Sequence, residues 1–235
     1  MNITNYFNYN DGCISFTRHQ ASTFAKGVAG DFNSIHDENA KRFCVPGDLL
    51  FSVFLAQYGV YQEMKFDFSG MVIETTELIF PDKIPQHFSL NGRNDKNYMD
   101  IVTLGDKSEE SDFIAALSEK YVQFSSKTFP DILVPLMEQE NVMINPSRPL
   151  VIYKSMEIYL DSFSGSHIEL ELKQATLKKN GKKAEVRLEF AILADNKEMG
   201  HGAKNLLLGG LREYNANQLN EVVDSYIQRK ENFSA

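Results

Sequence analysis

Residues 30–36, which read GDFNSIH, carry the side chains best suited to acid–base chemistry in this chain of 235 residues. Asp31 and His36 lie five residues apart in a segment between two predicted helices. A carboxylate beside a histidine can take a proton from water and deliver it to another atom. Gly30 permits an unusual backbone angle where the first helix ends, and the side chain of Asn33 can brace a tight turn. The segment therefore predicts a catalytic pair, Asp31 and His36, aimed at one point.

Gly47 follows eleven residues after His36, immediately before a second predicted helix that runs from Asp48 to about Tyr61. The first N–H groups of a helix have no partner within the helix, and the helix dipole favours negative charge there. Such N–H groups can stabilise an oxyanion. The helix is apolar nearly all round, which predicts that it is buried.

The elements around these residues change their hydrophobic period along the chain. A helix from about Thr17 to Val28 is predicted by the capping box that Thr17 forms with Gln20. From Gly70 onward the period is two, which is typical of strands. The predicted strands are Met71–Phe80, Gln86–Arg93, Tyr98–Leu104 and Asp112–Phe124.

The second half of the chain repeats this order of elements without an obvious buried helix before its strands. Asn180-Gly181 is a strong hairpin signal between two of these strands. A helix from Asn217 to Lys230 closes the chain. The predicted strands are Ser155–Phe163, His167–Lys178, Ala184–Asp195 and Glu198–Leu211.

The GDFNSIH segment resembles the signature of the MaoC-like dehydratases, which include the (R)-specific enoyl-CoA hydratases. Their motif reads roughly Gly-Asp-x-Asn-Pro-(Ile/Leu/Val)-His, and here Ser34 takes the place of proline. The resemblance covers about residues 15–125 and implies a hotdog fold, with Asp31 and His36 as the catalytic pair and Gly47 as the donor of an oxyanion N–H. The sequence is also similar to an uncharacterised bacterial family with the same altered motif.

The resemblance further implies where the substrate lies. An acyl chain would run beside the buried helix, lined by Phe51, Phe54 and Leu55, with Asn33 at the substrate-binding loop. Residues 45–47 read Val-Pro-Gly where the family commonly has Ala-His-Gly, and this departure bears on activity and substrate choice more than on the fold.

These observations predict an α+β protein built as a double hotdog, in which antiparallel sheets wrap a long buried helix. Residues 1–126 form the unit that carries the motif, residues 127–150 a linker rich in proline, and residues 151–235 a second, degenerate unit with a C-terminal helix. The predicted function is that of a hydro-lyase, hydrating enoyl thioesters or dehydrating 3-hydroxyacyl thioesters of coenzyme A or acyl carrier protein. It needs no cofactor beyond that substrate and has one site per chain.

Two alternatives remain open. Asp31 can serve only as a cap, and His36 only as a core histidine with its hydrogen bonds satisfied. In that case the protein is a non-catalytic hotdog that binds an acyl thioester or another small ligand. An acyl-thioesterase requires an acidic residue on the buried helix that faces the thioester, and Asp48 and Glu63 lie only at its ends.

Composition excludes several other classes. A formal net charge of −8 leaves no basic footprint for nucleic acid, and the lysines at 178, 179, 182 and 183 read as a solvated hairpin turn. No apolar run reaches the ~18–20 residues that a membrane span needs. Cys13 and Cys44 fit no metal spacing, so no metal is predicted. Residues 1–10 lack the features of a secretory signal, which favours a cytoplasmic protein, and a homodimer is compatible with the sequence.

Overall fold

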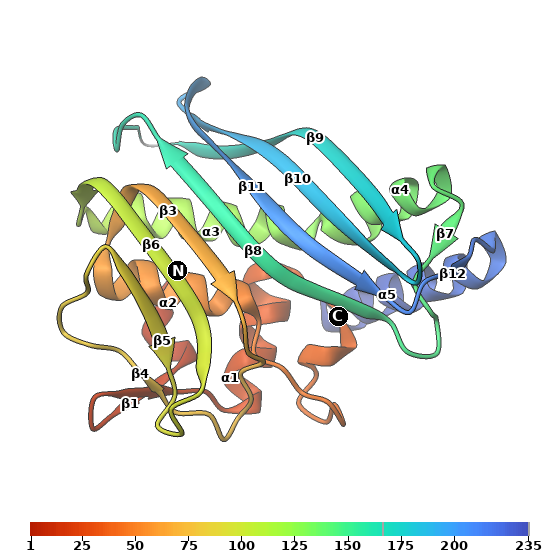
Figure 1. Ribbon diagram of the computed structural model, residues 1–235, viewed down its shortest axis with the longest axis horizontal. Helices are drawn as coiled ribbons and strands as arrows, with labels where there is room; N and C mark the ends of the chain where they lie inside the picture. Colours follow the sequence, from red (N-terminus) through yellow and green to blue (C-terminus); the bar gives the residue numbers. More distant parts are fainter. Residues whose placement is uncertain (166, 235) are drawn as a thin grey trace.

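A computed structural model describes residues 1–165 and 167–234. Its main element is a seven-stranded antiparallel sheet with the strand order β5-β6-β3-β8-β11-β10-β9. Two helices, α2 (Gly47–Tyr58) and α3 (Ser111–Ser126), lie across the same face of this sheet (Figure 1). The strands are β3 Val60–Phe68, β5 His87–Asn91, β6 Asn97–Ser108, β8 Leu150–Leu160, β9 Ile168–Asn180, β10 Lys183–Ala194 and β11 Lys197–Gly209.

The helix α2 confirms the predicted buried helix, although it ends three residues earlier than expected. Most of its side chains are buried, because the strands of the first half wrap over it and α3 lies beside it. Gly59 ends the helix with φ +81°, a conformation that suits glycine, and strand β3 begins at the next residue. Strand β3 was absent from the sequence prediction, which counted Val60 and Tyr61 as helix.

The prediction of a strand over Asp112–Phe124 is wrong, because this segment forms the helix α3. Its buried residues recur at helical spacing, with Phe113, Leu117 and Tyr121 on one side. On that side Ser118 Oγ donates to Ser52 Oγ of α2 at 2.8 Å. Helix α3 therefore packs beside α2 and precedes the strands of the second half. The prediction that these strands lack a preceding buried helix is wrong.

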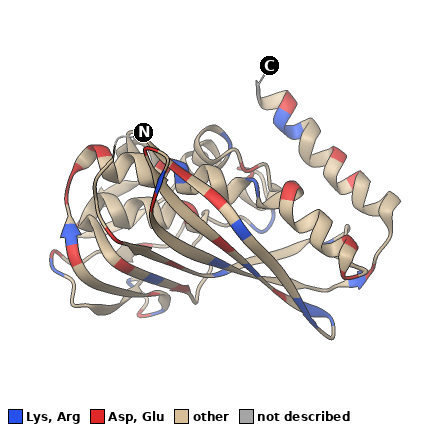
Figure 2. Cartoon of the chain, turned by 90° about the horizontal axis from the view of Figure 1, so that it is seen from above, with Lys and Arg blue, Asp and Glu red and all other residues tan. Residues whose placement is uncertain are grey.

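The two halves meet where β3 pairs with β8 in the middle of the sheet. Five residue pairs form this antiparallel seam, from Glu63 opposite Tyr159 to Asp67 opposite Ser155. Three of the four strands of the second half were predicted to within two residues of their observed bounds, whereas β8 begins five residues before the predicted Ser155. The Asn180-Gly181 hairpin is confirmed, since Asn180 pairs with Lys183 and Gly181 has φ +59°. Figure 2 shows the lysines gathered at the tip of this hairpin.

The first 46 residues and residues 70–80 form short elements at the end of the sheet. Helix α1 (Arg18–Thr23) begins at the predicted capping box, in which Thr17 Oγ1 accepts from the N–H of Gln20 and Gln20 Oε1 from the N–H of Thr17. Only Leu78–Ile79 of the predicted strand Met71–Phe80 is a strand, β4. The other short elements are η1 Ile3–Tyr6, β1 Asn8–Asn10, β2 Cys13–Ser15, η2 Phe24–Ala29 and η3 Ser34–His36.

The segment predicted as a linker, residues 127–150, carries structure of its own. It forms η4 (Thr128–Ile132), α4 (Leu133–Gln139) and β7 (Val142–Met143). Strand β7 pairs with β12 (Arg212–Glu213), and the side chains of this segment help to fill a second hydrophobic core under β9–β11. The division of the chain into units stays a prediction, and the order of elements favours a second unit that begins with α3.

Helix α5 (Ala216–Ser234) matches the predicted C-terminal helix. Most of its side chains are exposed, and only Leu219 is buried in the second core. Within the described part of the chain, no helix combines the length and the apolar character needed to cross a membrane.

Candidate functional site

Asp31 is positioned by the end of η2, a π-helical segment that continues α1. Gly30 adopts the left-handed conformation at φ +75°, which turns the chain out of the helix. The N–H of Asp31 then donates to the carbonyl of Ala25 at 2.7 Å. Asp31 therefore leaves the helix at a fixed angle, as expected from the glycine.

Asn33 links Asp31 to the turn that carries His36. Its N–H donates to Asp31 Oδ1 at 2.9 Å, and its own Oδ1 accepts from the N–H of Ile35 at 3.2 Å. This second contact caps the short helix η3, whose last residue is His36. The side chain of Asn33 thus braces the loop, while its predicted role in substrate binding stays a prediction.

His36 lies against Asp31 in a defined tautomer. Its Nδ1 is 2.7 Å from the carbonyl oxygen of Cys44, which can only accept, so Nδ1 carries the proton. The other ring nitrogen, Nε2, is 3.6 Å from Asp31 Oδ2. The His36 side chain is 11% exposed and that of Asp31 32% exposed. The two predicted residues are thus brought together, with two acceptor atoms facing the same point.

This geometry suits a water molecule better than a direct contact. A separation of 3.6 Å exceeds that of a hydrogen bond between the two side chains. A water about 2.8 Å from each atom can donate one proton to His36 Nε2 and one to Asp31 Oδ2. The pair can therefore polarise a water and hold the proton that it releases.

Gly47 is the first residue of α2, as the oxyanion prediction requires. The structure also gives a packing reason for glycine here, because a Cβ at this position would lie 2.7 Å from Cδ1 of Tyr153. Its N–H belongs to the first turn, which has no acceptor within the helix. The backbone of Gly47 can therefore present a donor, and its role in binding an oxyanion stays a prediction.

Phe51, Phe54 and Leu55 are completely buried on α2. The Phe51 and Phe54 rings pack edge-on against Phe66 of the overlying strand, at centroid distances of 5.4 and 5.0 Å. These three side chains belong to the core beside the site. An acyl chain lined by them requires the core to open, so their predicted role stays a prediction.

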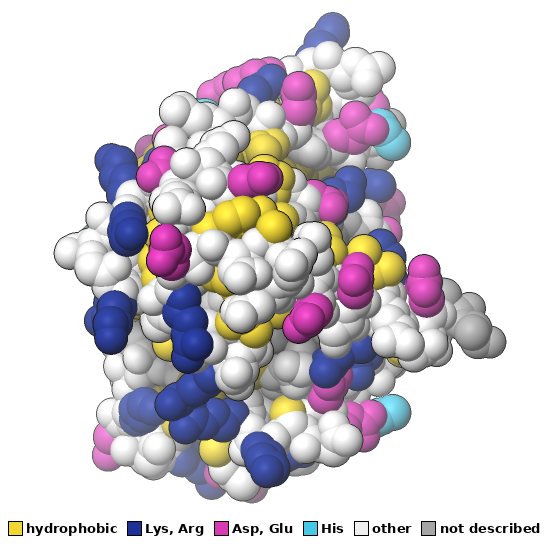
Figure 3. Space-filling view, turned by 90° about the vertical axis from the view of Figure 1, so that its right-hand side faces the viewer, with side chains coloured by type: hydrophobic (Ala, Val, Ile, Leu, Met, Phe, Trp, Pro, Cys, Tyr) yellow, Lys and Arg dark blue, Asp and Glu magenta, His cyan; other side chains and the backbone are white. Residues whose placement is uncertain are grey.

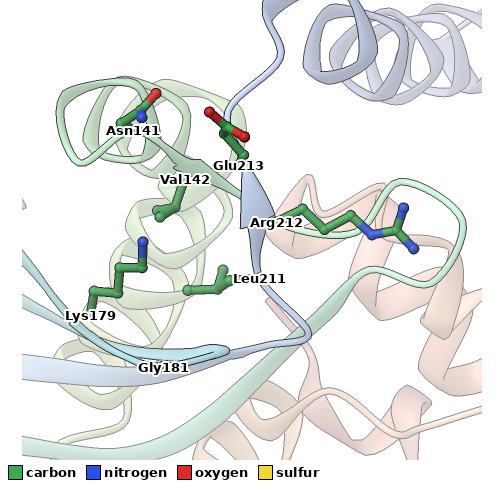
Figure 4. Close-up of a pocket in the computed structure, with 7 residues that line it drawn as sticks. All are labelled: Asn141, Val142, Lys179, Gly181, Leu211, Arg212 and Glu213. Carbon is green, nitrogen blue, oxygen red and sulfur yellow. The ribbon is translucent and has the colours of Figure 1, made fainter.

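The pocket drawn in Figure 4 lies away from Asp31 and His36, between β7, β12 and the tip of the β9–β10 hairpin. It measures about 350 Å³. Lys179 extends toward Val142 across it, whereas Arg212 turns away from the other labelled side chains. On this side of the molecule, Figure 3 shows basic side chains gathered in the lower left part and acidic ones mostly in the upper and right-hand parts. The pocket itself is lined by side chains of both charges, Lys179, Arg212 and Glu213.

A buried polar cluster that sequence reasoning missed lies beside the first turn of α2. Ser125 Oγ donates to Asp48 Oδ2 at 2.5 Å, and Lys204 donates to Ser125 Oγ. Lys204 Nζ is 3.6 Å from Asp48 Oδ1 and 3.9 Å from the centre of the Tyr153 ring. The hydroxyl of Tyr153 bonds to that of Tyr121. We call Asp48, Ser125, Lys204, Tyr153 and Tyr121 the buried cluster.

Burial dominates the electrostatics of the buried cluster. It lowers the pKa of Lys204, although the charges of Asp48 and Asp31 act in the opposite direction. Burial likewise raises the pKa of Tyr121 and Tyr153, to which the charge of Asp48 adds. Because Asp31 acts on Lys204, the cluster and the Asp31–His36 pair share one electrostatic environment.

One sequence signal pointed toward Lys204. In strand β11 it stands two and four residues before Leu206 and Leu208, which both face the second core, so it shares their alternation. A lysine in a strand is normally exposed, so the sequence alone did not predict that the Lys204 side chain is buried. Ser125 follows Tyr121 and Leu117 at intervals of four residues, which is helical spacing. The prediction of a strand over Asp112–Phe124 concealed this pattern.

Helix α5 covers the loop that carries Asp31. The hydroxyl of Tyr226 accepts from the N–H of Phe32 at 3.2 Å and donates to the carbonyl of Gly30 at 3.3 Å. Burial raises the pKa of this hydroxyl, and the charge of Asp31 adds to the effect. Arg229 forms an ion pair with Asp37 at 2.9 Å on the same side. The C-terminal helix therefore holds both ends of the GDFNSIH loop in place.

Cys44, whose carbonyl accepts from His36, is a further residue close to the site. Burial raises the pKa of the Cys44 thiol to about 12, so it is protonated and unsuited to attack a substrate. Among the residues that the structure describes, no group of three or more His, Cys, Asp or Glu side chains is placed to hold a metal ion.

The fold and the site together define an α+β protein in which an antiparallel sheet packs on buried helices, with an Asp–His pair in the loop between η2 and α2. The chain belongs to the family described as "Protein of unknown function (DUF3581)", whose model matches residues 1–217. No curated protein matches the chain.

Three solved structures are similar to this chain. The tesB protein of Mycobacterium avium subs paratuberculosis has 8% identity and a TM-score of 0.45, over 72% of this chain and 89% of that one. A MaoC-like dehydratase has 8% identity and a TM-score of 0.43, over 86% and 97%. The acyl-CoA thioesterase II TesB2 of Mycobacterium marinum has 11% identity and a TM-score of 0.42, over 92% and 99%.

Proposed function

We propose that the protein hydrates the double bond of a 2-enoyl thioester, or dehydrates a 3-hydroxyacyl thioester in the reverse direction. The observation that carries this proposal is the separation of 3.6 Å between His36 Nε2 and Asp31 Oδ2, with Nδ1 of His36 held protonated by the carbonyl of Cys44. Two acceptor atoms that face one point are what the activation of a water requires.

The reaction needs three groups and no cofactor. A water held by the pair gives up one proton to Asp31 or His36, and its oxygen bonds to C3 of the enoyl group. The electrons of the C2=C3 bond shift toward C1, so that the thioester oxygen gains the charge of an enolate. The N–H of Gly47 would donate to this oxygen. The proton held by the pair then returns to C2, the carbonyl re-forms, and the product is the 3-hydroxyacyl thioester.

The proposal includes a double hotdog architecture. In the first unit α2 is followed by strands β3–β6, and in the second α3 is followed by β8–β11. Among the residues that the structure describes, only the first unit carries an Asp–His pair, so one site per chain is proposed. Coenzyme A and acyl carrier protein are both suitable carriers of the thioester, because both present the same reacting group.

The test is turnover of 2-enoyl-CoA substrates of short and medium chain length, followed by loss of the conjugated double bond. Asp31→Asn keeps the acceptor for the N–H of Asn33 and removes the base, and His36→Ala removes the imidazole. We expect each variant to lose about 100- to 10,000-fold in kcat. His19→Ala is the matched control, because His19 pairs with the carboxylate of Glu38 at 2.8 Å on the exposed surface.

Two other outcomes would replace the proposal. Binding of acyl-CoA without any change of the double bond indicates a non-catalytic binding protein. Release of free coenzyme A indicates a thioesterase, for which the buried Asp48 carboxylate at the start of α2 is the acidic residue in place. Absence of hydration by the wild-type protein across these chain lengths refutes the hydratase.

A further inference from the structure

The buried cluster contains an ammonium group whose partners are the carboxylate of Asp48, the hydroxyl of Ser125 and the ring of Tyr153. Lys204 is 4% exposed and is the one lysine or arginine classed as buried among residues 1–165 and 167–233. Taking an ammonium ion out of water is costly, and an apolar side chain of similar size often stabilises a core as well or better. A buried cation beside a candidate site therefore calls for a role in that site.

Two atoms of the buried cluster, Lys204 Nζ and Asp48 Oδ1, make fewer hydrogen bonds than they could. An ammonium group has three donors, and Lys204 Nζ makes one hydrogen bond, to Ser125. Asp48 Oδ1 is buried without a hydrogen bond, and it lies 3.6 Å from Nζ, too far for one. Buried polar atoms that lack a partner in a native protein commonly meet a ligand or a water. The donors left on Lys204 suit an oxygen acceptor.

The position of Lys204 relates it to the proposed reaction. Its ammonium group lies over one face of the Tyr153 ring, and the edge of this ring abuts the backbone of Gly47. Ser126, next to Ser125, has its Oγ 3.6 Å from the place where a Cβ on Gly30 would lie. Lys204 thus lies at the first turn of α2, and its partner Ser125 precedes the residue whose side chain faces Gly30.

The charges around this point require a cation. A substrate oxygen at the first turn of α2 would face the carboxylates of Asp31 and Asp48, which oppose the negative charge of an enolate. Lys204 is the buried cation that both carboxylates act on. Without it, the N–H of Gly47 and the helix dipole would act alone against two negative charges.

We infer that Lys204 is a further catalytic residue, whose ammonium group donates to the thioester oxygen and stabilises the enolate beside the N–H of Gly47. Asp48 and Ser125 are positioning residues that hold the ammonium group in place. This inference rests on the proposed function, because it names the group that stabilises the charge formed there.

The experiment uses acetoacetyl-CoA, a 3-oxoacyl thioester whose enolate absorbs in the near ultraviolet more strongly than its neutral form. We expect the full-length wild-type protein to produce the enolate band at neutral pH. Lys204→Met should lose the band while still binding the ligand, and Lys204→Arg should keep part of it. With enoyl-CoA, Lys204→Met should lower kcat about 100-fold with little change in KM.

Two controls separate this role from a structural one. Lys65→Met removes a lysine that also lies over a tyrosine ring, that of Tyr159, but on the exposed side of the sheet, and should change neither the band nor kcat. Should Lys204→Met fail to fold, Lys204→Gln keeps an N–H donor without the charge, on a side chain that is one bond shorter. It should also lose the band.

The outcomes of the two assays are distinct. A band that depends on Lys204 in a protein without hydratase activity supports this inference and refutes the proposed function. Hydration that is equally fast in folded Lys204→Met and Lys204→Gln, with the band unchanged, overturns the inference and leaves the hydratase standing. A wild-type protein with neither band nor turnover refutes both.

Discussion

The hydroxyl of Tyr226 offers the sharpest test of how α5 holds the catalytic loop. It accepts from the N–H of Phe32 and donates to the carbonyl of Gly30, so Tyr226→Phe removes both hydrogen bonds and keeps the ring. The ring should stay in place, because it packs edge-on against Phe32 and Phe129 at centroid distances of 6.1 and 5.3 Å. The change is therefore confined to two polar contacts.

The expected magnitude follows from these contacts. Leaving the N–H of Phe32 without its acceptor and losing the second bond should cost about 1–3 kcal/mol. Because the contacts join α5 to the loop, the cost should appear as easier local opening. Amide exchange at residues 30–36 should then speed up by about 5- to 150-fold, while strands β10 and β11 keep their protection.

The assay is amide hydrogen exchange, followed by peptide mass spectrometry. Tyr9→Phe is the matched control, since Tyr9 is 56% exposed and lies on β1 at the other end of the chain. Unchanged exchange at residues 30–36 in Tyr226→Phe would refute the idea that α5 restrains the loop. Equal acceleration throughout the sheet would show instead that the hydroxyl supports global stability.

Three further predictions concern stability, each measured by thermal or urea unfolding. Thr17→Ala removes the capping box and should cost about 1 kcal/mol; an unchanged midpoint would contradict this. Gly47→Ala forces the Tyr153 ring to move and should cost about 1–3 kcal/mol, and a neutral effect would show that the ring yields freely. Burial raises the pKa of Tyr153 above that of tyrosine in the unfolded chain. The stability that the un-ionised hydroxyl contributes is therefore complete below about pH 10, where unfolded tyrosine begins to ionise, and is lost as the pH rises further. Tyr153→Phe should therefore lose less stability between pH 9 and 11 than the wild-type protein, and an equal loss would refute the assignment.

The features predicted correctly are those encoded over a few neighbouring residues. The capping box at Thr17, the left-handed glycine at Gly30 and the Asn180-Gly181 hairpin each depend on local backbone chemistry. The convergence of Asp31 and His36 also follows from a seven-residue segment, because the turn braced by Asn33 fixes both side chains. The carbonyl of Cys44 and the hydroxyl of Tyr226 hold the segment further, so its geometry also depends on residues outside it.

The features that were missed depend on distant contacts. Helix α3 buries serines as well as apolar residues, because Ser118 bonds to Ser52 of α2 and Ser125 to Asp48. These polar positions break the apolar stripe by which a helix is recognised. Lys204 enters the interior for the same reason, since its partners come from α2 and α3, about 150 and 80 residues earlier in the chain. Sequence pattern alone cannot supply such partners.

The pairing of β3 with β8 has a consequence for how the chain folds. Its five residue pairs join positions about 90 residues apart, whereas the β9–β10 hairpin closes over a two-residue turn. Contacts between distant positions require a large loop to close first, so they form late and slow the folding of the whole domain. The central seam of the sheet should therefore form after the hairpins on either side, and the rate of folding should respond most to changes along Glu63–Asp67.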